Sequence, residues 1–145
     1  MNLESRALLL QEAGLIVVAE AWSGQVPAPM EAWRLIIGGE VTPTAVVPTL
    51  DGIDQWDEVE AVWDSVARDS GIFGGRNEFL ISVAGPGAAD APWAHVRRDS
   101  RPKLAHLSFS SVEEPEFVAM SLDGRCVCGV TAEEYAVWVV ARSFE

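Results

Sequence analysis

The chain has 145 residues, a formal net charge of −12 and an apolar fraction of 49%, and it contains six tryptophans. This length is typical of one domain, and so high an apolar fraction excludes a disordered chain. The negative charge argues against binding to nucleic acid or to anionic membranes, because both are bound through Lys and Arg. We therefore expect one globular domain, residues 1–145, that is attracted to basic partners.

The first elements are a helix and strands. Residues 3–12 predict a short helix that ends at Gly14, because glycine is favoured just past a helix C-terminus. Residues 15–22 (LIVVAEAW) are β-branched and then alternating, which predicts a strand. The apolar run WRLII, residues 33–37, predicts a second strand, and two prolines restrict residues 40–50 to an edge segment or a loop.

The clearest helix signal covers residues 54–69. Asp54 can accept backbone N–H groups as the N-cap, and apolar residues recur at three- and four-residue spacing. The apolar stripe consists of Trp56, Val59, Val62, Trp63 and Val66. Asp57, Glu60 and Asp64 lie on the side away from this stripe, and Arg68 is placed to pair with Asp64. These acids form either a solvated face or a contact surface for a basic partner.

The second half of the chain predicts a mostly antiparallel sheet. The expected strands are residues 79–84, 93–98, 104–109, 117–121 and 125–130. Asp123-Gly124 between the last two strands is a hairpin signal. Thr131 and Glu134 form a capping box, which predicts a final helix over residues 132–144, although VWVV within it would also suit a strand. The expected class is an α+β layer fold with about three helices.

Further candidates for partner contact lie outside the long helix. A second acidic cluster in a loop consists of Glu113, Glu114 and Glu116, and it has the same two interpretations. Trp22 and Trp93 sit beside turns, where a tryptophan either packs in the core or anchors an interface. Arg97, Arg98, Arg101 and Lys103 form a basic group that either meets a partner's acidic patch or lies across from the protein's own acids.

Residue types that carry chemistry are present but poorly arranged. His95, His106, Cys126 and Cys128 are types that zinc accepts, yet their spacing matches no usual zinc site, and no histidine adjoins a cysteine. The two cysteines would lie on one face of a strand as free buried thiols, which suits a reducing compartment. No catalytic or phosphate-binding motif occurs. We expect no enzymatic activity, no cofactor and no metal.

No targeting segment is visible in the sequence. The apolar Leu8-Leu9-Leu10 follows Glu4 and precedes Gln11-Glu12, unlike a secretory signal. No apolar run approaches the roughly 20 residues that cross a bilayer. A cytoplasmic protein without membrane contact is therefore the expectation.

The stretch FVAMSLDGRCVCGVTAEEYAVWVV, residues 117–140, resembles the end of actinobacterial antitoxins of the type that neutralises the tuberculosis necrotizing toxin, an NAD glycohydrolase. The small, acidic, Trp-rich chain is also similar to immunity proteins of bacterial polymorphic toxin systems. This resemblance implies a cytoplasmic protein that binds and occludes one cognate toxin, an NAD-consuming enzyme or a nuclease with a basic active-site cleft. The alternatives are an acidic secretion chaperone, which would normally dimerise, and a small-ligand-binding domain.

Overall fold

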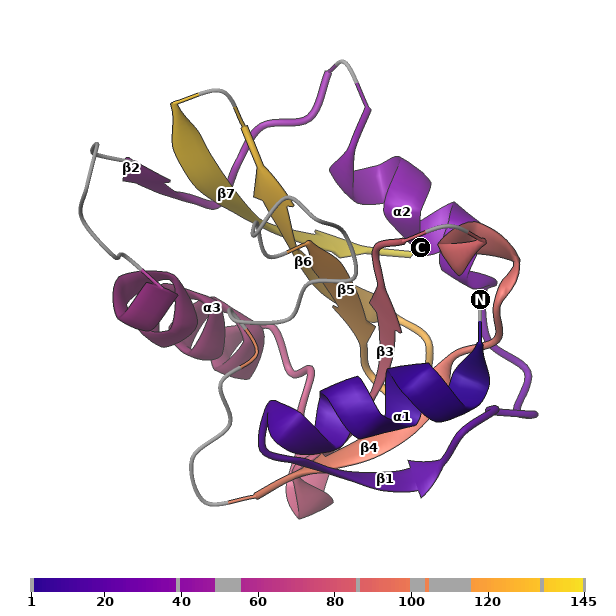
Figure 1. Cartoon of the computed structure of the whole chain (residues 1–145). Coiled ribbons are helices and arrows are strands. Elements are labelled where there is room, and N and C mark those ends of the chain that lie inside the picture. Colours follow the sequence, from indigo (N-terminus) through magenta and orange to yellow (C-terminus); the bar gives the residue numbers. More distant parts are fainter. Residues whose placement is uncertain are drawn as a thin grey trace.

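The computed structural model describes residues 2–38, 40–48, 56–85, 87–99, 104, 116–133 and 135–144. In this part of the chain, seven antiparallel strands form one sheet in the order β1-β4-β3-β5-β6-β7-β2. Helices α1 and α3 pack on one face of the sheet, and α2 packs on the other, away from them in Figure 1. The predicted α+β class, with three helices and an antiparallel sheet, is confirmed.

The helices are α1 (Leu3–Glu12), α2 (Pro29–Ile36) and α3 (Trp56–Asp69), with short 3-10 helices η1 (Gly74–Arg76) and η2 (Ala88–Asp90). The strands, in chain order, are β1 (Leu15–Ala19), β2 (Ala45–Pro48), β3 (Glu78–Val83), β4 (Ala94–Arg98), β5 (Phe117–Met120), β6 (Cys126–Ala132) and β7 (Ala136–Ser143). Most of these elements match a predicted segment within a few residues at each end. The hairpin expected at Asp123-Gly124 joins β5 to β6, with the Gly124 φ at 74°.

Residues 33–37 do not form a strand, as the run WRLII predicted, but lie at the end of α2. This helix begins at Pro29, whose fixed φ suits the first helical position. The Glu31 carboxylate reaches back and accepts the Ala28 N–H at 2.8 Å. The buried side chains recur at helical spacing, at Pro29, Ala32, Trp33 and Ile36. The helical signals thus lie upstream of the apolar run, which by itself suits either structure.

The chain ends in strand β7, and the helix predicted over residues 132–144 is wrong. Strand β7 pairs with β6 along seven residues, from Cys126↔Ser143 to Ala132↔Val137, and with β2 on its other side. Thr131, expected to cap the helix, is instead paired with Trp138 inside β6. The backbone of β7 finds hydrogen-bond partners in a neighbouring strand on each side. These many bonds outweigh the single capping pattern that favoured a helix.

Several predicted features lie outside the described residues. They are the Asp54 N-cap, the Trp56 side chain, His106, Glu134, the acidic residues Glu113 and Glu114, and the basic residues Arg101 and Lys103. Of the strand predicted at residues 104–109, only Leu104 is described, and its side chain is fully buried.

Both faces of the sheet carry a hydrophobic core. On the α1 and α3 face, the Trp63 ring packs edge-on against Phe73 and Phe117, with centroids 5.5 and 5.2 Å apart. On the α2 face, the core includes Trp33, Trp93 and Met120. Gly129 of β6 lets α2 approach closely, because a Cβ there would overlap Cδ1 of Ile36.

A buried arginine joins α1 to the connections beside β1 and β4. Arg6 is 1% exposed. Its Nη1 donates to the Pro92 carbonyl at 2.6 Å, and its Nη2 donates to the Glu20 carbonyl at 2.5 Å. Burial lowers the pKa of Arg6, and the charge of Glu20 partly offsets this effect. The guanidinium therefore connects the chain just after β1 to the chain just before β4.

We expect the substitution Arg6→Met to lower the free energy of unfolding by about 2–4 kcal/mol, because methionine retains much of the volume but leaves two carbonyls without their donors. The matched variant Arg76→Met, at an exposed position, should cost less than about 0.5 kcal/mol. Urea denaturation of both variants measures the difference. Equal losses would contradict the bridging role of Arg6.

Candidate functional site

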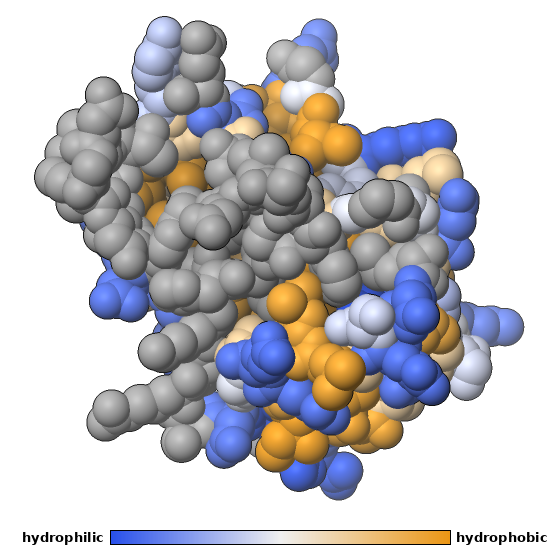
Figure 2. Space-filling model, viewed as in Figure 1, coloured by the Kyte–Doolittle hydropathy of each residue, from blue (hydrophilic) through white to orange (hydrophobic). Residues whose placement is uncertain are grey.

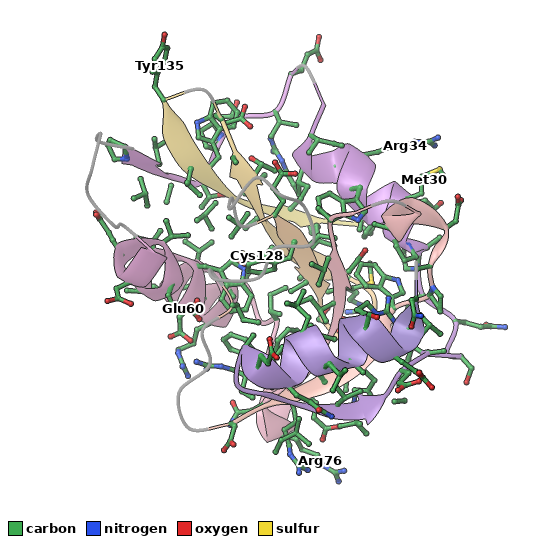
Figure 3. The ribbon with its side chains drawn as sticks, viewed as in Figure 1. Met30, Arg34, Glu60, Arg76, Cys128 and Tyr135 are labelled. Atoms are coloured by element: carbon green, nitrogen blue, oxygen red, sulfur yellow. The ribbon has the colours of Figure 1, made fainter. Side chains whose placement is uncertain are left out.

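The acidic face of α3 is only partly available to a partner. Asp57 and Glu58 are exposed in the first turn, where the positive end of the helix dipole favours carboxylates. Glu60 is half-buried and engages in an interaction within the protein. Its position on α3 is labelled in Figure 3. Of the predicted acidic face, Asp57 is therefore the fully exposed member, with Glu58 exposed beside it in the first turn.

Asp64 belongs to an ion-pair cluster that joins α3 to β4. Its carboxylate contacts the guanidinium of Arg98 and lies 3.3 Å from Nη2 of Arg68. The Arg98 guanidinium in turn lies 4.3 Å from the centroid of the Phe73 ring. The predicted pair with Arg68 is confirmed, and of the basic group Arg98 lies across from an acid of the protein itself. Asp64 therefore has a structural role.

Substitutions in α3 separate the structural acid from the exposed ones. We expect Asp64→Asn to lower the free energy of unfolding by about 1–2 kcal/mol, because its partner Arg98 is largely buried and loses its counter-charge. Asp57→Asn, the matched control, should cost less than about 0.5 kcal/mol. Thermal or urea unfolding tests both. A neutral effect of Asp64→Asn would show that the cluster does not stabilise the fold.

The second acidic cluster is described only at Glu116. Its carbonyl accepts the Ala84 N–H at 3.0 Å, which holds the start of β5 against the end of β3. Glu116 lines a shallow pocket of about 280 Å³ there, bounded by α2, the end of β3 and η2. The remaining lining residues are Trp33, Ile37, Ala84, Gly85 and Ala88. We call this site the α2 pocket.

Apolar side chains reach the surface beside the α2 pocket. Ile37 is 60% exposed, and Met30, seven residues earlier on the same side of α2, is 38% exposed. Figure 2 shows apolar surface over the C-terminal end of α2. Arg34 points outward next to Met30 in Figure 3, and its Nη2 lies 3.4 Å from the Met30 sulfur. Arg34 lies between these two apolar side chains along the helix, and single exposed apolar side chains are common on protein surfaces.

The two tryptophans that were candidate anchors pack within the protein. Trp93 is 3% exposed, its indole N–H donates to the Pro27 carbonyl at 2.8 Å, and its own carbonyl accepts the Trp22 N–H. Trp22 is half-buried and packs edge-on against His95, with centroids 5.0 Å apart. A Cβ on Gly24 would lie 2.6 Å from the Trp22 indole nitrogen, so a larger residue there would displace the Trp22 ring. Core packing accounts for most of the surface of both rings.

His95 and the two cysteines lie on opposite sides of the sheet. His95 Nε2 is 2.7 Å from Oε1 of Glu78, on the α2 side. Cys126 and Cys128 are free thiols of the other core, on one face of β6 as predicted. These three residues therefore form neither a Cys–His pair nor a shared metal site. Among the described residues, no group of three or more His, Cys, Asp or Glu could hold a metal ion.

Burial raises the pKa of the Cys128 thiol from its ordinary value of 9.0 to about 12. The unfolded chain therefore loses this proton first. The contribution of Cys128 to stability is fully present below about pH 9 and is lost as the pH rises toward 12, at a slope of up to about 1.4 kcal/mol per pH unit. Urea unfolding at several pH values should show this loss, and Cys128→Ala should reduce it. The same slope in both proteins would show that the loss of stability at high pH does not come from Cys128.

A larger depression, of about 340 Å³, lies between residues 71–76 and the β5–β6 turn. Glu78 lines it but is paired with His95. Asp123 also lines it, and hydrogen bonds from Ser121 Oγ and the Arg125 N–H lower the pKa of Asp123. Because both carboxylates are already engaged, we assign no ligand to this depression.

The described helices are all too short or too polar to cross a bilayer. Comparisons with protein-family models, with curated proteins and with solved structures found no match for this chain. The resemblance of residues 117–140 to antitoxins therefore stays a prediction. In the structure those residues belong to the three strands β5, β6 and β7 and their connections.

Proposed function

We propose that this protein is an immunity protein that binds one toxin and covers its basic active-site cleft. The observation that carries the proposal is the exposed acidic N-terminal end of α3, at Asp57 and Glu58, on a chain with a net charge of −12. Exposed charge of one sign speeds encounter with a surface of the opposite sign. Binding of this kind requires no reacting group in the inhibitor.

The proposed target is an enzyme that acts on an anionic substrate, either an NAD-consuming enzyme or a nuclease. A cleft that holds phosphate groups is lined by basic side chains, and an acidic inhibitor complements it. The two free thiols, Cys126 and Cys128, support a reducing compartment, and we propose that the protein acts in the cytoplasm.

The proposal is tested by affinity capture from the native lysate, followed by kinetics with the purified partner. The double variant Asp57→Lys/Glu58→Lys should slow association about tenfold at low salt and flatten its salt dependence, with little change in dissociation. The control Glu4→Lys/Glu12→Lys makes the same charge change at exposed positions of α1. Surface plasmon resonance at two ionic strengths measures both.

Equal association rates for the two double variants would mean that the acids of α3 are only a solvated face. A captured partner whose toxicity the chain leaves intact would contradict the proposed function itself. A stable dimer of the isolated chain in a size measurement would favour a secretion chaperone instead.

A further inference from the structure

We infer that the turn between β6 and β7 enters the basic cleft of the target protein, with the ring of Tyr135 as its anchor. The inference rests on the proposed function and names the part of this chain that fills the cleft. Tyr135 is the only tyrosine of the sequence, and it is 76% exposed. Among the described residues it is the most exposed of the large apolar side chains, and the others are aliphatic. Its side chain points away from the sheet in Figure 3.

The β6–β7 turn projects, but its base is firmly held. The Glu133 N–H donates to the Ala136 carbonyl at 2.8 Å, directly beyond the last pair of the ladder, Ala132↔Val137. Val137 is 2% exposed in the core, and β7 is also paired with β2 on its other side. An ordered turn loses little conformational entropy on binding, and tyrosine has only two side-chain torsions to fix. The turn is therefore well suited to carry an anchor.

The chemistry of the β6–β7 turn complements a cleft that holds an anionic substrate with aromatic bases. Glu133 is exposed, so the turn presents a carboxylate and the ring of Tyr135 together. NAD and nucleic acids likewise carry aromatic bases beside phosphate groups. The ring can stack where a base would lie, and the carboxylate can pair with a basic side chain that would otherwise meet a phosphate. Tyrosine is also among the residues that most often dominate the energy of protein interfaces.

The acidic end of α3 lies on the same side of the molecule as the β6–β7 turn. Strand β2 ends at Pro48, which pairs with Ala136, the residue after Tyr135, and the next element of the chain is α3. Figure 1 shows the start of β7, strand β2 and the N-terminal end of α3 on this side. One partner can therefore meet Asp57 and the turn together. The acids then speed encounter, and the buried ring slows release.

The first experiment is photo-crosslinking with the full chain in the native lysate. The photoreactive residue p-benzoylphenylalanine replaces Tyr135, and mass spectrometry identifies the peptide to which it becomes attached. We expect one covalent product, attached to residues that line the active-site cleft of the captured protein. The same photoreactive residue at Leu8, which is 62% exposed on α1, should give no product with that protein.

The second experiment measures the binding of variants to the protein identified by crosslinking. Tyr135→Ala should weaken binding about 30-fold, chiefly through faster dissociation, and Tyr135→Phe should stay within about threefold of the original chain because it keeps the ring. Glu133→Gln should weaken binding about threefold and reduce its salt dependence. The matched controls Leu8→Ala and Glu12→Gln, at exposed positions of α1, should leave binding unchanged. Urea unfolding of Tyr135→Ala should match that of the original chain, because the side chain is exposed.

The inference is overturned if position 135 forms no crosslink, if the crosslink lies outside the active-site cleft, or if Tyr135→Ala binds as tightly as Leu8→Ala. These outcomes are distinguishable from failure of the proposed function. A toxin that Tyr135→Ala captures and inhibits as well as the original chain does would refute the role of the turn alone. A protein that is bound through Tyr135 but stays fully toxic would refute the proposed function, while the contact made by the turn would stand.

Discussion

Every side chain of β5 is buried, and this constraint shapes the rest of the structure. A strand buried on both sides needs an apolar layer over each face of the sheet. On one face, α1 and α3 provide that layer, with Trp63 at its centre. On the other face the layer depends on α2, which is only eight residues long. Because so short a helix covers only part of that face, apolar surface stays open where α2 ends, and the α2 pocket lies there.

The same layering decides which charges a partner can meet. One side of α3 is committed to the core, so its acids are left on the outer side. Asp64 is then engaged by Arg98, which belongs to a strand of the sheet. Asp57 and Glu58, in the first turn of the same helix, are exposed. The net charge of −12 is therefore a poor guide to the surface, because part of it is used to hold the fold together.

The exposed carboxylates and the paired carboxylate of α3 differ in what they can contribute. Charges at Asp57 and Glu58 would act over a Debye length, so their proposed contribution is to the rate of encounter with a basic partner. Asp64 is held by Arg98, so its substitution reports on the stability of the fold instead.

The sequence by itself determined the elements whose signals are local. Gly14 ends α1, the apolar stripe of α3 has helical spacing, and Asp123-Gly124 marks the β5–β6 hairpin. The pairing of Asp64 with Arg68 also follows from spacing along one helix. The short apolar run at residues 33–37 was predicted wrongly, because periodicity over so few residues does not distinguish a buried helix from a strand. The final helix was predicted wrongly because a local capping pattern at Thr131 was given more weight than the strand-like run at residues 137–140.

Only the tertiary structure decided what depends on distant partners. Residues 137–140 are a strand because β6 and β2 supply hydrogen bonds on both edges. The Asp64–Arg98 contact and the α2 pocket likewise join residues far apart in the chain. The physical reason is that local preferences amount to a few tenths of a kcal/mol per residue, whereas burial and strand pairing add over many residues at once.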